Sequence, residues 1–157
     1  MTLWDFYKYH IEPSMFALTR AGNRGIRIDV EQRFKLRDIA IESLDKYKEE
    51  VKQLSNNDFD PGSATQVMNF LYDELKLPPQ LHPKTKKRTG DDDALSVLQR
   101  KYPQHSNLID RILKFRRTRT LLTTFLTSQL SSLDRMQTSY NVAGTVNGRI
   151  ASSAPLE

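Results

Sequence analysis

The sequence contains no cysteine, and its three histidines, His10, His82 and His105, are scattered along the chain. Disulfide bridges and thiolate zinc sites are therefore excluded, and the histidine spacing matches no metal-binding pattern. No apolar run approaches the roughly 20 residues that a membrane-spanning helix needs, and the first residues lack the apolar centre of a signal peptide. We expect an intracellular, cytoplasmic protein with no bound metal and no membrane partner.

Glycine is also scarce, with 6 residues in 157, and the chain shows no internal repeat and no tract of low complexity. Hydrophobic residues make up 38% of the chain and charged residues 27%. That balance is typical of a folded chain with a modest core, and the length suits one domain or a core with an appended element. A large multidomain enzyme is excluded.

The net charge of +5 is unevenly distributed. Residues 83–120 hold eleven lysines and arginines against four aspartates, whereas residues 1–82 hold eleven basic and thirteen acidic side chains. The basic excess is therefore confined to the middle of the chain. A polyanion that contacts this region is the simplest explanation, and nucleic acid is the commonest such partner.

The longest apolar repeat lies within residues 108–130, which also hold the densest group of arginines. Apolar side chains recur there at helical spacing and predict one helix to about Leu130, with a stripe that needs a packing partner. The stripe consists of Leu108, Ile112, Phe115, Leu122 and Leu126. Arg116 and Arg119 fall near its edge. Two interpretations stay open: a solvated helix face, or a surface that follows nucleic-acid phosphates.

Helical spacing also predicts a helix over residues 4–21, with a kink or a second start at Pro13. Two glycines, Gly22 and Gly25, are expected to stop it before a short edge strand around residues 26–28. Asp29 is the predicted N-cap of a long helix over residues 30–54. Its inward side is predicted to hold Phe34, Ile41, Leu44, Tyr47, Val51 and Leu54.

The second half of the chain mixes short helices with turn-rich segments. Ser63 is expected to cap a helix to about residue 75, and Asp91 or Asp92 a helix to about residue 100. Between them, residues 82–93 contain no large apolar side chain, and they form either a mobile loop or a tip that carries charge. After residue 134 the pattern changes to alternating β-branched and aromatic residues and predicts a β-hairpin or two short strands.

No catalytic motif is present: the sequence has no phosphate-binding glycine loop, no nucleophile elbow and no HExxH zinc motif. The only carboxylate cluster, Asp91 to Asp93, is consecutive, so its side chains point in different directions around a helix start. We interpret these aspartates as helix caps rather than metal ligands.

Five segments, in order, resemble the motifs of family A DNA polymerases, the bacterial DNA polymerase I type. The segment GTVNGRIASSAP is similar to the family's T-x-T-G-R-L-S-S-x-x-P, although Asn147 and Ala151 depart from it. Four further family motifs are similar to segments of this chain: AGNRGIRID, FDPGSATQV, the pair LKLP and KTKKRTGDDDALSVL, and ILKFRRTRTLLTTFL. The matched positions include Gly25, Ile26, Asp29, Phe59, Pro61, Ser63, Gln66, Arg116, Leu121, Thr124, Thr145, Gly148, Arg149, Ser152 and Pro155.

The resemblance implies a thumb subdomain followed by the start of the palm, in a mainly α fold with long antiparallel helices and a short C-terminal β-hairpin. It implies that the thumb binds primer-template duplex DNA through the phosphate backbone, and that Arg149 reaches the minor groove. The implied DNA-binding residues are Lys84, Thr85, Lys86, Lys87, Arg88, Arg116, Arg119, Thr145, Asn147 and Arg149. The parent polymerase would add dNTPs to a primer 3′ end with Mg²⁺. The carboxylates for that reaction are not in this chain, so we expect it to be inactive alone, with no cofactor of its own.

The domain boundaries implied are residues 1–28 for a palm-proximal helix and strand, 29–132 for the thumb with its tip at about 82–93, and 133–155 for the palm entry. Residues 156–157 are interpreted as a cloning remnant. The remainder of the polymerase is the expected partner, and a monomer is expected. Two alternatives stay open: a free-standing helical nucleic-acid-binding accessory module, and a structural helical protein with a solvated basic face.

Overall fold

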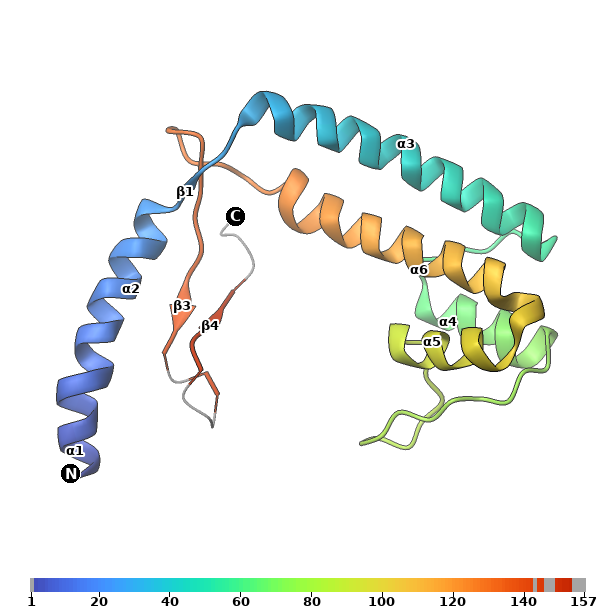
Figure 1. The fold of residues 1–157 in the computed structure, drawn as a ribbon, viewed down its shortest axis with the longest axis horizontal. Helices are drawn as coiled ribbons and strands as arrows, with labels where there is room; N and C mark the ends of the chain where they lie inside the picture. Colours follow the sequence, from blue (N-terminus) through green and yellow to red (C-terminus); the bar gives the residue numbers. More distant parts are fainter. Residues whose placement is uncertain (1, 143, 146–148, 154–157) are drawn as a thin grey trace. The chain divides into compact units, whose positions relative to one another are not determined.

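The computed structural model describes residues 2–142, 144–145 and 149–153, and it is mainly helical with small antiparallel strand pairs, as predicted (Figure 1). The chain divides into two compact units. Unit 1 consists of Met1–Arg37 and Thr123–Glu157, and unit 2 of Asp38–Leu122. One boundary falls within the long helix α3 (Val30–Ser55), and the other falls within the π-type turn η4 (Leu122–Leu126).

Unit 1 begins with a helical run in three parts: α1 (Leu3–Phe6), the π-type turn η1 (Tyr7–Ile11) and α2 (Glu12–Arg24). Pro13 lies in the first turn of α2, but that helix continues without a break from η1, because Ile11 has helical backbone angles. The prediction of a kink or a second start is therefore met only by the change from π-type to α-helical bonding next to Pro13.

The predicted end of this helix at Ala21 is wrong, because Gly22 lies inside α2. Gly22 is buried, and a Cβ atom there would clash with the carbonyl oxygen of Thr138, so the glycine permits a close backbone approach. Gly25 ends the helix with φ +64° and ψ −178°, a backbone conformation that essentially only glycine adopts.

The strands of unit 1 form two small antiparallel pairs. Strand β1 (Ile26–Arg27) pairs with β2 (Arg135–Met136), with Ile26 opposite Met136. Strand β3 (Tyr140–Asn141) pairs with β4 (Ala151–Ser152) and packs against α2. The predicted edge strand and the predicted C-terminal hairpin are both confirmed. An isolated pair of this length is marginal in water, so the helix that covers it stabilises it.

Helix α3 (Val30–Ser55) starts as predicted, because the Asp29 carboxylate accepts the N–H of Gln32 at 3.0 Å. Its predicted inward side is largely wrong. Of the six side chains, only Val51 is buried, while Phe34, Ile41 and Leu54 are each about half exposed. The reason is that, among the described residues, the core cluster of unit 2 reaches α3 at Val51, and the other buried residue of α3 is the small Ala40.

In unit 2, α4 (Ala64–Met68) continues into the π-type turn η2 (Asn69–Glu74) and follows the loop of residues 59–63. Ser63 is the N-cap of α4, and Gln66 Oε1 accepts the N–H of Asp60 at 2.7 Å. Phe59 stacks on Phe70 with ring centroids 4.9 Å apart, and Pro61 is buried. All the matched residues of the FDPGSATQV segment therefore build the turn into this helix.

The remaining helices of unit 2 are α5 (Asp92–Lys101), the short 3₁₀ turn η3 (Pro103–His105) and α6 (Ser106–Leu121). The Asp91 carboxylate accepts the N–H of Ala94 at 2.8 Å, which confirms the predicted cap. Helix α6 passes into the π-type turn η4 (Leu122–Leu126), so the predicted end at Leu130 is wrong. The Arg33 guanidinium donates to the carbonyls of Phe125 and Ser128 and satisfies the free end of the helix.

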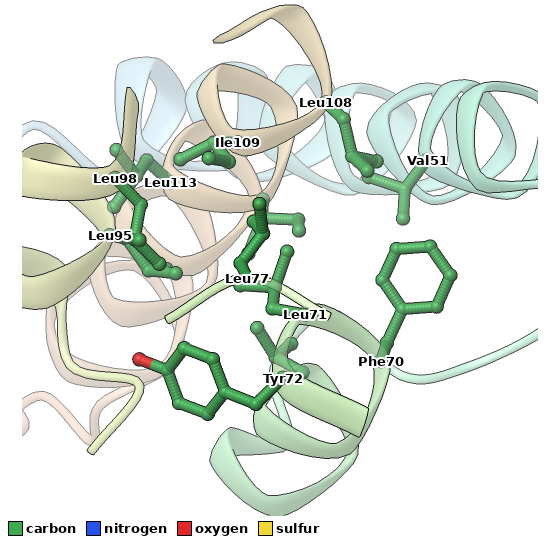
Figure 2. Close-up of a cluster of buried hydrophobic side chains, with 12 residues drawn as sticks. Val51, Phe70, Leu71, Tyr72, Leu77, Leu95, Leu98, Leu108, Ile109 and Leu113 are labelled. Atoms are coloured by element: carbon green, nitrogen blue, oxygen red, sulfur yellow. The ribbon is translucent and has the colours of Figure 1, made fainter. Parts of the chain in front are cut away.

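The core of unit 2 gathers side chains from α3, α4, η2, α5 and α6 (Figure 2). Its members are Val51, Val67, Phe70, Leu71, Tyr72, Leu77, Leu95, Leu98, Leu108, Ile109, Ile112 and Leu113. Each fully buried leucine or isoleucine contributes about 1.5–3 kcal/mol relative to exposure. Of the predicted stripe of α6, Leu108, Ile112 and Phe115 are buried, and the neighbouring Ile109 and Leu113 are buried as well.

Candidate nucleic-acid interface

Residues 80–89 form an ordered hairpin-like segment, which we call the tip. Leu81 and Arg88 form an antiparallel bridge, the N–H of His82 donates to the Lys87 carbonyl at 2.8 Å, and the N–H of Thr89 donates to the Gln80 carbonyl at 2.9 Å. The sequence left two interpretations open for this region, a mobile loop and a tip that carries charge. The internal hydrogen bonds fit the charged tip better. These backbone contacts fix the positions of the Cα atoms from which the side chains of the tip project.

The tip presents three exposed lysines, Lys84, Lys86 and Lys87, together with the exposed Thr85. Across the described ranges, the ammonium groups of these lysines form no ion pair and no hydrogen bond with the protein. Their positive charge is therefore not neutralised by a direct contact with another described residue. A lysine ammonium is a mobile donor that suits a phosphate oxygen without demanding one geometry.

Arg88, although predicted as part of the same DNA-binding set, is held within the protein. Its guanidinium is 2.8 Å from the Asp73 carboxylate and lies over the Tyr72 ring at 5.3 Å from the centroid. The Tyr72 hydroxyl donates to the Thr89 carbonyl at 2.6 Å. Burial raises the pKa of Tyr72, so the phenol remains a hydrogen-bond donor at neutral pH. These contacts attach the base of the tip to η2.

Arg116 is mostly buried, with 14% of its side chain exposed. Its Nε donates to the Pro61 carbonyl at 3.0 Å, and its Nη1 donates to the Gly90 carbonyl at 2.6 Å. Nη1 also lies 3.4 Å from the Asp92 carboxylate. One guanidinium therefore joins three segments: the loop before α4, the residue that follows the tip, and the start of α5.

Arg119, one turn further along α6, is more accessible, with 51% of its side chain exposed. Its Nη1 lies 3.6 Å from the Asp60 carboxylate and next to Gly62. The Asp60 carboxylate in turn accepts the N–H of Gly62 at 2.8 Å. An exposed ion pair at this distance contributes little to stability.

The remaining predicted site residues belong to unit 1. The Thr145 hydroxyl accepts the N–H of Arg149 and donates to the Arg149 carbonyl, both at 2.8 Å. Arg149 is exposed, and its guanidinium makes no hydrogen bond or ion pair with any other described residue. Asn147 lies outside the described residues, as do the matched Gly148 and Pro155.

The structure thus brings six of the predicted cations into unit 2, on the tip and on α6, while Thr145 and Arg149 lie in unit 1. Sequence reasoning missed the residues that hold this surface in place, namely Asp60, Tyr72, Asp73 and His82. The Asp-Pro-Gly turn at residues 60–62 was a usable signal for Asp60. No local pattern pointed to Asp73 or His82, because their partners are set by the fold of the tip.

The carboxylates do not fit a catalytic metal site. Among residues 2–142, 144–145 and 149–153, no three histidine, aspartate or glutamate side chains gather where they could hold a metal ion. Asp91 caps α5, and Asp92 faces Arg116. We therefore assign no metal-dependent step to this segment. Within the same ranges, no helix is both long and apolar enough to cross a membrane.

Comparison with known proteins gives consistent results. The chain is 30% identical over 159 residues to the thermostable DNA polymerase I of Thermus thermophilus, a match that covers 98% of this chain and 18% of the relative. It is 25% identical over 147 residues to DNA polymerase I of Bacillus subtilis, covering 91% of this chain and 16% of that protein. The chain therefore spans less than a fifth of the length of these relatives.

A solved structure is also similar: the POL domain of Pol1 from M. smegmatis in complex with DNA primer-template and dNTP. The match has a TM-score of 0.69 and 26% sequence identity, and it covers 83% of this chain and 23% of that chain. The model of the family described as DNA polymerase family A matches residues 31–156. Together with the segments that the sequence itself carries, these matches show that the chain belongs to DNA polymerase family A.

Proposed function

We propose that this chain is the part of a family A DNA polymerase that holds primer-template duplex. Residues 29–132 act as the thumb, residues 1–28 as its palm-proximal support and residues 133–155 as the entry to the palm. The parent enzyme adds dNTPs to a primer 3′ end with Mg²⁺, and its remaining segments supply the catalytic carboxylates. The observation that carries this proposal is a set of three exposed, unpaired lysines on an ordered tip.

Within this surface we assign different tasks to different cations. Lys84, Lys86 and Lys87, with Thr85, contact the duplex phosphates directly, because their polar ends are exposed and are not held by the protein. We assign Arg119 to the same contact because about half of its side chain is exposed, at 51%. Arg88 and Arg116 support binding by holding the tip and α5 in place, since their guanidinium groups are engaged inside unit 2.

Thr145, Asn147 and Arg149 form the second part of the proposal, a contact to the minor groove. Acceptor atoms at that groove are shared by all correct base pairs, so a guanidinium there checks pair geometry without reading sequence. The Thr145 hydroxyl would set the direction of Arg149 through the two backbone bonds described above. In the parent polymerase, Arg149→Ala should slow primer extension more than it weakens binding, with Arg117→Ala as a charge-matched control; an unchanged extension rate would contradict this role.

The direct test is the salt dependence of duplex binding by the chain, measured by fluorescence anisotropy with a labelled primer-template. If about three to five phosphates are engaged, log K against log[salt] should fall with a slope of roughly −3 to −5. Changing Lys84, Lys86 and Lys87 together to glutamine should make that slope shallower by about 3. A slope that stays flat in the unchanged chain would exclude DNA binding by this surface and favour a merely solvated basic face.

The matched control is a triple glutamine variant at Lys46, Lys48 and Lys101, which are exposed lysines outside the tip. It removes the same net charge, so it reports how much of any loss is a general electrostatic effect. The proposal requires the tip variant to lose clearly more affinity than this control. Equal losses in the two variants would show that the tip has no special part in binding.

A further inference from the structure

The tip is organised around a histidine that no DNA-binding motif assigns. The ring nitrogen Nδ1 of His82 accepts the N–H of Lys84 at 3.3 Å and the N–H of Thr85 at 3.2 Å. The same residue also donates its backbone N–H to Lys87 and accepts the N–H of Lys86 at 2.9 Å. All three tip lysines and Thr85 are therefore bonded to His82 through their backbones.

The geometry resembles an aspartate or asparagine turn. In such turns the side-chain oxygen attached to Cγ accepts the N–H groups two and three residues further on. In His82 the atom in that place is Nδ1, which is also attached to Cγ. The difference is chemical, because an amide oxygen accepts hydrogen bonds at any ordinary pH, whereas Nδ1 accepts only while it carries no proton.

We infer that His82 is a positioning residue that orders the lysine tip only in its neutral form, so that acid releases the tip. Protonation would convert Nδ1 from an acceptor to a donor that faces two backbone N–H groups. The ordering is therefore present at higher pH and is lost as the pH falls through the titration of the ring. Imidazole is the side chain whose ordinary titration falls between about pH 5 and 8.

Charged groups of both signs lie near the ring. Lys84, Lys86, Lys87 and Arg88 lie on the same segment. On the α5 side, Asp91 and Asp93 line a cavity of about 320 Å³ together with His82 and Lys84.

The first experiment uses the complete chain without DNA. In ¹⁵N-labelled protein titrated from about pH 8 to 5.5, the amide signals of Lys84 and Thr85 should move in step with the ring protons of His82. In His82→Asn, whose side-chain oxygen replaces Nδ1, these two amides should show no such step, while His10 and His105 still titrate. Amides that stay still while the His82 ring titrates, or that move equally in His82→Asn, would overturn the inference.

The consequence for binding rests on the proposed function and is tested separately at about pH 8. His82→Ala should lower duplex affinity by about fivefold, the effect of losing a helix-cap-like acceptor, whereas His82→Asn should stay close to the unchanged chain. If the glutamine variant of the three tip lysines loses affinity but His82→Ala does not, the positioning role is wrong. If neither variant loses affinity, the proposed function fails, while the titration result for the free protein stands by itself.

Discussion

The two units bury apolar surface in very different ways. Unit 2 contains a cluster of twelve buried side chains, several of them fully inaccessible (Figure 2). In unit 1, Gly22 is the only described residue that is buried. Its helical run instead exposes large aromatic residues, with Trp4 at 68% and Phe16 at 67% accessible.

The difference indicates which unit contributes most to the free energy of folding. Burial of apolar area is the main favourable contribution to folding, so unit 2 carries its own driving force. Unit 1 relies on backbone bonds, short strand pairs and a few side-chain contacts, and a typical hydrogen bond of this kind contributes only about 0.5–1.5 kcal/mol. We therefore expect unit 1 to open locally at a lower free energy than unit 2.

The largest effect is expected from truncating the core of unit 2. Ile109 is fully buried, so Ile109→Ala should lower the free energy of unfolding by about 2–5 kcal/mol. Phe16→Ala in unit 1 should change it by less than about 0.5 kcal/mol, because that ring is already mostly in solvent. Urea denaturation followed by circular dichroism measures both. A cost for Phe16→Ala as large as that for Ile109→Ala would break the comparison between the units.

A second prediction concerns polar contacts within unit 2. Arg116→Ala should cost about 2 kcal/mol, because the carbonyl groups of Pro61 and Gly90 lose their donors together. Arg116→Lys should restore little, since one ammonium cannot reproduce the forked geometry of a guanidinium. Duplex binding should weaken in parallel through the displaced tip. If Arg116→Ala weakens binding while leaving urea denaturation unchanged, Arg116 contacts DNA itself, as the sequence predicted.

The core of unit 2 and the contacts of Arg116 show how far the sequence alone could predict this structure. Helical spacing and turn chemistry correctly predicted which segments are helical, the caps at Asp29, Ser63 and Asp91, and the C-terminal hairpin, but the helix ends predicted at Ala21 and Leu130 were wrong. Spacing did not decide which face of α3 is buried, because that depends on where the core touches the helix. Spacing also could not distinguish the mostly buried Arg116 from the exposed tip lysines. In the sequence they are all cations of one basic region, and only the fold determines which of them contact other protein groups.

A third prediction tests the joint between α2 and β1 in unit 1. Gly25→Ala places a side chain on backbone at φ +64°, and its Cβ would lie 2.5 Å from the Met136 carbonyl oxygen. We expect a cost of about 1–3 kcal/mol, confined to unit 1. Hydrogen exchange should accelerate in β1 and β2 and remain unchanged in α5. Equal acceleration in both would show that the units unfold together, and the distinction drawn between them would then be wrong.

The smallest predicted effect is a stabilisation in unit 2. Lys76 follows η2 in the left-handed region at φ +54°, directly before Leu77, whose N–H donates to the Leu71 carbonyl at 3.0 Å. This is the position after a helix where glycine is preferred, because a Cβ atom is strained there. Lys76→Gly should therefore raise the free energy of unfolding by up to about 1 kcal/mol, measured by urea denaturation. Lys48→Gly, within α3, is the control and should lower it by a similar amount, since glycine disfavours a helix interior. A loss of stability in Lys76→Gly would mean that the lysine side chain contributes more than its backbone strain costs.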